Sequence, residues 1–297
     1  MDRHESAEHP SSSGAAKSDM TRWGGPPNID MGISYWGFAL PALPLDSRHG
    51  TDRFSPMKNA PTLPLSIIIP ARNEASGIVA TLLPLQGMRR RGGEVIVVDG
   101  ESRDDTIERA APLADRVLAS KPGRARQMNA GAEIARGKVL WFLHADTIAP
   151  RGADRILPNA LAERAWGRFA VRLSGEKRHP LLWLVARMMN ARSCLTGIAT
   201  GDQGIFMRRS AFDRVGGFPE IALMEDIAIS RGLKGVVGRP ACVATRITTA
   251  SRRWEESGIP RTILSMWGLR LAFFLGVDPK RLARHYRTSP PNPATQE

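Results

Sequence analysis

Three short apolar runs, each followed directly by polar or acidic residues, limit the folds open to this chain. The runs are LSIIIPARNE (65–74), EVIVVDGESRDDT (94–106) and VLWFLHADT (139–147). Runs of Val, Ile and Leu bounded by turn residues are typical of buried parallel strands. Open α/β sheets bind their ligands beyond the carboxyl ends of such strands. We therefore expect one rim of a binding site to contain Pro70, Asn73, Glu74, Asp99 and Asp146.

The segments around these runs alternate between helix and strand patterns. The spacing predicts helices over 74–88 (kinked at Pro84), 105–111 and 124–136, and a strand over 116–119. Farther on it predicts a helix over 151–164, an exposed strand over 167–174, an apolar helix or lid over 180–195, and a strand over 204–207. Strands that alternate with short helices indicate βαβ units. The expected fold class is α/β with a mixed, mostly parallel sheet.

Composition divides the chain into three parts. Residues 1–60 are rich in Ser, Pro and Gly and have no periodicity, which predicts a disordered N-terminal extension. Residues 61–250 carry the strand and helix patterns of one two-part domain. Residues 251–297 are expected to form a C-terminal helical segment.

The charge of the chain points to anionic partners. The formal net charge is +13 and the isoelectric point is near 10.8, which favours nucleotides, phosphorylated lipids or acidic membranes. A basic but merely solvated surface explains the same numbers equally well. Lys and Arg are scattered, without an aromatic-interleaved stripe or zinc-finger spacing, so we expect no nucleic-acid partner.

The cysteines and the length of the longest apolar stretch are evidence on the cellular compartment of the protein. Cys194 and Cys242 are the two cysteines, without a CxxC pair, so we expect a reducing compartment with neither a disulfide framework nor a zinc site. The polar N-terminus does not resemble a secretory signal. The apolar stretch 263–277 is interrupted by Arg270 and is shorter than the ~20 residues of a transmembrane helix. These features predict a cytoplasmic protein.

Two acids at strand ends are candidate ligand contacts. Asp99 can accept a hydrogen bond from a pyrimidine N–H or a ribose hydroxyl; the alternative, a helix N-cap, is better served by Asp104. A dehalogenase-type phosphatase would need a second Asp two residues on, where this chain has Glu101. Asp146 can hold Mg²⁺ or Mn²⁺ against a diphosphate, or can cap the helix expected after Pro150.

The order of seven motifs resembles the family 2 glycosyltransferases. The motifs are IIIPARNE, VVDGESRDDT, GRARQMNAG, FLHADT, GDQG, MED and SRRW, which together span about residues 64–287. More closely, the order resembles the bacterial branch of arsenosugar-biosynthesis-associated glycosyltransferases. The resemblance implies a GT-A fold, in which a Rossmann-like nucleotide-binding half is followed by an acceptor-binding half, and transfer with inversion at the anomeric carbon.

The resemblance also implies roles for single residues. It implies a nucleoside pocket lined by Pro70, Arg72, Glu74 and Asp99, and contacts to the nucleoside and diphosphate from Arg124, Gln127 and Asn129. Asp146 matches the last acid of the DxD metal motif. The position of the first acid is His144 here, a departure that leaves three roles open: metal ligand, ribose contact or packing residue.

The remaining motifs belong to the second half of the chain. Glu225 and Asp226 match the ED motif of the family, and we expect Asp226 to be the general base with Glu225 in support. The alternative is an ordinary acid pair at a helix start. In GDQG and SRRW, sugar or diphosphate contacts are expected from Asp202, Gln203, Arg252 and Arg253, with Trp254 over the acceptor; a plain turn and an exposed helix start are the alternatives.

The sequence therefore predicts an inverting, metal-assisted hexosyltransferase. The expected donor is a nucleoside diphosphate sugar, a UDP-sugar for preference, and the acceptor is a hydroxyl group on a small or lipid-linked molecule. The alternatives are a nucleotide- or phospholipid-binding protein without transferase activity and a sugar nucleotidyltransferase. The apolar stretch 263–277 and the basic residues after it suit either an anionic membrane surface, which would be the inner face, or a helix buried against the domain or in a dimer.

Overall fold

A computed structural model of the chain describes residues 64–175 and 179–288. The extension expected over 1–60 lies outside the described residues. Within them, eight strands form one sheet in the order β3-β2-β1-β4-β7-β6-β8-β5. The strands are β1 (Leu65–Ala71), β2 (Glu94–Asp99), β3 (Arg116–Ala119), β4 (Val139–Phe142), β5 (Thr147–Ile148), β6 (Trp166–Leu173), β7 (Phe206–Arg208) and β8 (Ala241–Thr249).

The sheet has a parallel half and a mixed half. Strands β3, β2, β1 and β4 run parallel to one another. Strand β7 is antiparallel to both β4 and β6, β6 is parallel to β8, and β5 is antiparallel to β8. This arrangement confirms the expected α/β fold with a mixed, mostly parallel sheet.

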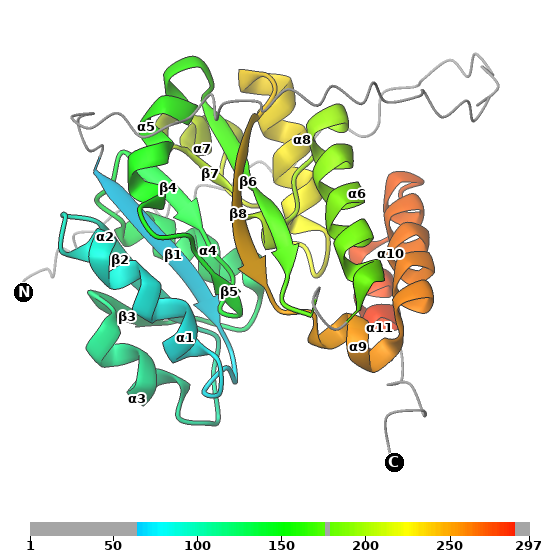
Figure 1. The fold of residues 1–297 in the computed structure, drawn as a ribbon, viewed down its shortest axis with the longest axis horizontal. Coiled ribbons are helices and arrows are strands. Elements are labelled where there is room, and N and C mark those ends of the chain that lie inside the picture. Colours follow the sequence, from blue (N-terminus) through cyan, green and yellow to red (C-terminus); the bar gives the residue numbers. More distant parts are fainter. Residues whose placement is uncertain (1–63, 176–178, 289–297) are drawn as a thin grey trace, which may run out of the picture. The chain divides into compact units, whose positions relative to one another are not determined.

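Side-chain alternation along β1 explains how the sheet is covered on both faces. Ile67 and Ile69 belong to one buried cluster, whereas Ile68 belongs to another. The first cluster packs against α1 (Ile78–Leu82), α2 (Gln86–Arg89), α3 (Thr106–Ala110) and α5 (Ala153–Glu163). The second packs against α4 (Arg124–Ile134), α7 (Arg209–Val215) and α8 (Glu225–Val237). Figure 1 shows these two helical layers on either side of the sheet.

A glycine sets how closely α4 approaches the sheet. A Cβ atom on Gly131 would lie 2.5 Å from Cγ2 of Ile68. Both positions are in the buried cluster beneath α4, where a clash with a β-branched side chain is not relieved by rotation. Glycine therefore allows α4 to lie directly on β1 and β2, with its first turn at the carboxyl ends of these strands.

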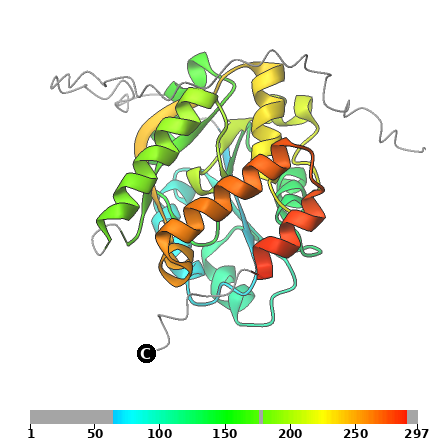
Figure 2. The same cartoon turned by 90° about the vertical axis from the view of Figure 1, so that its right-hand side faces the viewer.

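The remaining helices cover the mixed half of the sheet. They are α6 (Pro180–Thr196), α9 (Arg252–Ser257), α10 (Ile259–Phe274) and α11 (Pro279–Thr288). Leu182 and Val185 of α6 form a small buried cluster on which Ile259 and Ile263 of α10 pack. Figure 2 shows α6, α10 and α11 on the same side of the described domain. None of the helices described here is long and apolar enough to cross a bilayer.

The helix expected over 74–88 begins at Ile78, and the irregularity expected at Pro84 is present as a 3₁₀ turn (Leu83–Leu85) between α1 and α2, because Pro84 lacks the N–H that would continue a helix. A further expectation about secondary structure needs correction. The strand over 167–174 was expected to be exposed, but β6 is almost wholly buried. Its neighbours β7 and β8 occupy both edges and α6 covers it, so even Arg168 is 2% exposed. Burial lowers the pKa of Arg168 to about 10.

The expectation of a chain without a disulfide is also wrong. Cys194 at the end of α6 is bonded to Cys242 at the start of β8, with their Cα atoms 6.0 Å apart. The guanidinium of Arg168 donates to the Cys194 Sγ atom at 2.7 Å, and Arg239 donates to the backbone carbonyl of Cys194. The two cysteines are 48 residues apart in sequence, so spacing alone gave no sign of the pair. The pairing removes the argument from cysteine usage for a reducing compartment.

Candidate active site

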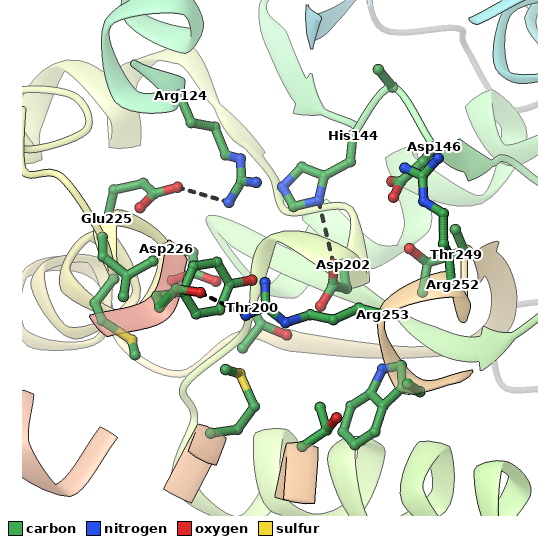
Figure 3. A pocket seen from close by; sticks show the side chains of 18 of the residues that line it. Arg124, His144, Asp146, Thr200, Asp202, Glu225, Asp226, Thr249, Arg252 and Arg253 are labelled. Carbon is green, nitrogen blue, oxygen red and sulfur yellow. Dashed lines mark hydrogen bonds and ion pairs between the residues drawn. The ribbon is translucent and has the colours of Figure 1, made fainter. Parts of the chain in front are cut away.

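A cavity of about 310 Å³ lies where the two halves of the sheet meet at the carboxyl ends of β1 and β4. Its lining includes eleven of the residues discussed below: Glu74, Arg124, His144, Asp146, Thr200, Asp202, Glu225, Asp226, Arg252, Arg270 and Tyr286. Figure 3 shows most of these side chains pointing into the same space from different elements. The cavity therefore gathers charged groups from the whole length of the described chain.

A second cavity, of about 500 Å³, adjoins the first on the side of α4. The two share Pro70, Glu74, Arg124, Glu225 and Tyr286 in their linings. Arg72, Gln127 and Lys280 line the second cavity and not the first. The two cavities thus adjoin at the ends of the parallel strands, and we call them together the trough.

The loops after β1 and β2 are bonded to each other. The backbone N–H of Asn73 donates to Ser102 Oγ at 2.9 Å, and the Asn73 side chain accepts from Arg103 N–H at 2.8 Å. The N–H of Glu74 donates to Thr106 Oγ1 at 2.8 Å. Asn73 has a φ of 54°, a left-handed conformation that asparagine tolerates better than most residues. These bonds hold the polar rim expected from the first two apolar runs.

Asp99 ends β2 with one satisfied and one unsatisfied oxygen. Its Oδ2 atom accepts from the N–H of Ser102 at 3.0 Å. Its Oδ1 atom is buried without a hydrogen-bond partner. Buried carboxylate oxygens are rarely left unpaired, because an unpaired one loses its hydration without compensation. Asp99 lines neither cavity, so this oxygen is open to a ligand only if the ligand reaches past the residues that line them.

Two residues expected to contact a nucleotide are held by the protein itself. The Gln127 side chain donates to the carbonyls of Ala71 and Val98 at 2.9 and 2.8 Å, which ties α4 to the ends of β1 and β2. The Asn129 side chain donates to the carbonyl of Phe218 and accepts from its N–H. Gln127 reaches the lining of the second cavity, whereas Asn129 lines neither cavity.

Asp146 and His144 lie in the loop after β4, beside Glu74. Burial raises the pKa of Glu74, and the negative charge of Asp146 raises it further. The Nδ1 atom of His144 lies 3.4 Å from Oδ1 of Asp202. Burial opposes ionisation of Asp202, but His144 and the charge of Arg124 outweigh it, so the pKa of Asp202 lies below its usual range.

These carboxylates fit a divalent cation that completes its coordination with substrate oxygens. Glu74 and Asp146 repel each other across the cavity, and a cation would relieve that repulsion. In the described ranges, no three His, Cys, Asp or Glu residues form a ready-made metal cage. Mg²⁺ and Mn²⁺ commonly use one or two carboxylates together with phosphate and water. Asp146 is the residue best suited to hold such an ion.

The glycine at the start of the GDQG turn makes room for His144. A Cβ atom on Gly201 would lie 2.3 Å from Nε2 of His144. Gln203, in the same turn, is fully buried; its amide donates to Ser193 Oγ at 2.9 Å, and its oxygen accepts from Thr200 N–H. Gln203 thus shapes the turn and does not reach the cavity, whereas Asp202 does.

The acid pair opens α8 at the other side of the cavity. Oδ2 of Asp226 accepts from Gly201 N–H at 2.9 Å, and Oδ1 accepts from Ile227 N–H at 2.7 Å. Met224, which precedes the helix, has a φ of 71°, a strained conformation for a side chain of this kind. This turn presents Asp226 to the cavity from the positive end of the helix dipole.

Glu225 is buried next to Asp226 and paired with Arg124. Its Oε1 atom lies 3.3 Å from Nη1 of Arg124. Burial raises the pKa of Glu225; Arg124 acts against this shift and Asp226 adds to it. Burial alone would lower the pKa of Arg124, but Glu225, Asp202 and Asp226 hold it above its ordinary value. Arg124 is therefore a fixed positive charge between the two cavities.

The C-terminal helices supply further cations to the cavity. Arg252, Arg253 and Trp254 of α9 line it, as the SRRW motif predicts. The guanidinium of Arg253 lies 3.4 Å from the ring centre of Tyr286 and donates to its backbone carbonyl at 3.1 Å. Trp254 also packs on the cluster beneath α6.

Several residues of the lining escaped the sequence analysis, among them Thr200, Arg270 and Tyr286. Arg270 had one visible signal, since it interrupts an otherwise apolar helix. Thr200 and Tyr286 had none, because their positions depend on how distant segments meet.

Comparison with known proteins identifies the family. The profile described as "Glycosyl transferase family 2" matches residues 66–216, which is just over half of the 297 residues. The chain belongs to this family.

Curated relatives of this family 2 member come from Mycobacterium tuberculosis. "Uncharacterized glycosyltransferase Rv1514c" is 27% identical over 176 residues, which is 54% of this chain and 64% of the relative. "Uncharacterized protein MT1568" is 36% identical over 107 residues, which is 34% of this chain and 31% of the relative. The matches thus span less than two thirds of those proteins, and they do not single out a branch of the family.

Solved structures support the fold of this family 2 member. A mannosyltransferase, PcManGT from Pyrobaculum calidifontis, in complex with GDP-Man and Mn²⁺, matches with a TM-score of 0.54 and 22% identity, over 82% of this chain and 69% of that one. S. aureus TarS 1-349 in complex with UDP matches with a TM-score of 0.51 and 17% identity, over 63% and 60% of the two chains. At these identities the similarity establishes the GT-A fold alone.

Proposed function

We propose that this chain is an inverting glycosyltransferase that moves a sugar from a nucleoside diphosphate, UDP for preference, to a hydroxyl group of an acceptor. The observation that carries the proposal is one cavity with Asp146 and arginines on one side and Asp226 on the other. Family membership supports the reaction class. The motif order is our reason for proposing the arsenosugar-associated branch.

The donor would lie along the trough at the carboxyl ends of the parallel strands. Asp99 would accept a hydrogen bond from the nucleoside through its unpaired oxygen. Pro70, Arg72 and Glu74 would form the wall of the pocket, since they line the second cavity. TarS, which shares the fold, binds UDP. A uracil offers an N–H group from which the unpaired oxygen of Asp99 could accept a hydrogen bond.

The diphosphate would lie between the cavities, where positive charge gathers. Arg124, Arg252 and Arg253 would pair with its oxygens through the forked donors of their guanidinium groups. A divalent cation held at Asp146 would neutralise the charge that develops on the leaving diphosphate. The mannosyltransferase with the same fold binds Mn²⁺ together with GDP-Man. Either Mg²⁺ or Mn²⁺ suits the oxygen ligands available here.

Asp226 would remove the proton from the acceptor hydroxyl. Direct displacement of the diphosphate requires a base on the acceptor side of the sugar, and it inverts the anomeric configuration. Two backbone N–H groups hold the Asp226 carboxylate in place at the start of α8. Glu225, paired with Arg124, would position the turn rather than take the proton. Trp254 would border the acceptor.

Calorimetric titration with UDP, GDP, CDP and ADP tests the donor site. We expect UDP to bind most tightly with Mn²⁺ present, and to bind at least tenfold more weakly with a chelator, because the ion bridges phosphate and protein. Release of UDP from UDP-sugars in the presence of candidate hydroxyl acceptors tests the transfer. A folded sample that binds none of the four nucleotides would contradict the proposal.

A further inference from the structure

The outer face of α10 is apolar and uncovered in the described structure. At about 100° per residue, Thr262, Met266 and Leu269 fall on one side of this helix. The first two line the cavity, and Leu269 is buried. The opposite side carries exposed side chains over more than two turns: Leu264, Trp267, Leu271, Phe274 and Leu275, of which Leu264 and Leu275 are 71% exposed. Helix α10 is thus apolar on both sides, and one side is largely exposed among the residues that the structure describes.

Helix α6 presents a second apolar stripe on the same side of the domain. Its exposed residues Leu181, Leu184, Met188 and Leu195 fall on one side of the helix, and the last of them is 76% exposed. The buried side of α6 packs against the first turn of α10. Figure 2 shows both helices toward the viewer. We call the exposed apolar residues of α6 and α10 the apolar face. Apolar patches of this kind mark interaction sites.

The charges around the apolar face indicate what kind of partner it binds. Helices α6, α10 and α11 contain no Asp or Glu. Arg187 lies over the Trp183 ring at 5.6 Å, and Arg231 lies over the Phe274 ring at 5.8 Å. Lys280 and Arg281 lie in the first turn of α11. Asp278, which precedes this helix, is the acidic residue nearest to them in sequence. A second copy of this chain would bring like charges together, since the net charge is +13.

We propose that the apolar face binds the surface of an anionic lipid bilayer. Aromatic and aliphatic side chains would enter the region between head groups and acyl chains, and the arginines would pair with anionic head groups. The helices would lie on the bilayer and would not cross it. This binding does not depend on catalysis.

Because α10 borders the cavity, binding to a membrane would determine which acceptor molecules lie near the site. The inner side of α10 is a wall of the catalytic cavity, so a docked domain would hold that cavity close to the lipid head groups. This step rests on the proposed function: the acceptor hydroxyl would be carried by a membrane lipid or by a molecule attached to one.

Sedimentation of the full chain with lipid vesicles tests the proposal. We expect co-sedimentation with vesicles of phosphatidylcholine and phosphatidylglycerol, weaker binding to phosphatidylcholine alone, and loss of binding as salt rises. Replacing both Trp267→Ser and Phe274→Ser should weaken binding to the mixed vesicles by about a hundredfold, because two large apolar side chains no longer enter the bilayer. Replacing Arg187→Glu and Arg281→Glu should abolish the preference for anionic lipid.

Matched variants separate this effect from general changes in the protein. Leu83→Ser with Ile107→Ser removes two exposed apolar side chains from the helices on the opposite face of the sheet, and it should leave sedimentation unchanged. Thermal unfolding and calorimetric UDP binding should be the same in all variants. A failure of UDP binding would therefore bear on the proposed function and not on the docking surface.

Three results would overturn the docking proposal. One is a folded wild-type protein that does not sediment with anionic vesicles. Another is a Trp267→Ser and Phe274→Ser variant that sediments as well as the wild type. The third is a wild-type dimer, seen by light scattering, that this double variant converts to a monomer; the apolar face would then be an interface between copies.

Discussion

The parallel and mixed halves of the sheet contribute to the site in different ways. In the parallel half, neighbouring loops hold the site, as when Asn73 bonds to Ser102 and Glu74 to Thr106. In the mixed half, the site relies on residues much farther apart in sequence, as when Glu225 pairs with Arg124. The first arrangement joins neighbouring loops, and the second depends on packing between distant segments. Substitutions in the parallel half should therefore change binding or stability, and those in the mixed half should change transfer.

The largest expected effect belongs to the mixed half. Asp226→Asn should lower the rate of transfer by about 10²–10⁴-fold, the usual contribution of a general base. The amide oxygen can still accept from Gly201 N–H, so UDP binding should persist. Measured transfer rates and calorimetric binding check this, with Asp213→Asn on the exposed part of α7 as the control. Transfer at the wild-type rate would exclude Asp226 as the base.

The corresponding change in the parallel half is Asp99→Asn. Its remaining oxygen can accept from Ser102 N–H, which leaves an NH₂ group where a nucleoside N–H would need an acceptor. We expect UDP affinity to fall by about tenfold to a hundredfold, from the loss of a charged hydrogen bond. The acidic control is Asp105→Asn, an exposed position near the same edge. Equal UDP affinity in wild type and Asp99→Asn would remove Asp99 from the pocket.

Two Gly→Ala changes should have different effects, one on stability and the other on transfer. Gly131→Ala presses on the stiff, buried Ile68, and should lower the free energy of unfolding by about 1–3 kcal/mol. Gly201→Ala presses instead on the end of the His144 ring, which can rotate away. It should leave stability nearly unchanged and reduce transfer, because the contact between His144 and Asp202 would be lost. Urea unfolding and transfer rates should be measured on both variants. A stable Gly131→Ala variant, or a Gly201→Ala variant that loses stability and keeps its transfer rate, would contradict the contrast between the two positions.

The smallest effect concerns Glu225 and pH. Its pKa is raised above the ordinary 4.5, chiefly by burial, so the folded state holds this proton more tightly than the unfolded state. Stability from this group is therefore present below pH 4.5 and is lost as the pH rises through the raised pKa, by about 1.4 kcal/mol per pH unit. Glu225→Gln should show a shallower decline in unfolding free energy over that window. Parallel curves for the two proteins would contradict this account.

The sequence predicted the parallel half well, because its signals are local. The strands were apolar runs, and candidates such as Asp99 and Asp146 lay at the end of a run or shortly after it. Motifs alone could not show that Gln203 is buried in its own turn or that Asn129 holds Phe218, since both depend on tertiary contacts. The mixed half was predicted less completely: β8 has no acidic end, and the burial of Arg168 follows from strands distant in sequence.

The bond between Cys194 and Cys242 closes a covalent ring around much of the mixed half. Thr200, Asp202, Glu225 and Asp226 all lie inside this ring, whereas Asp99, Arg124 and Asp146 lie outside it. A closed loop of this length restricts the unfolded chain by about 4 kcal/mol in the chain-entropy description. Reduction would remove that restriction from the segment that carries the proposed base and not from the segment that holds the nucleotide. The stability of the segment that carries the proposed base therefore depends on the redox state of the surroundings, and that of the segment that holds the nucleotide does not.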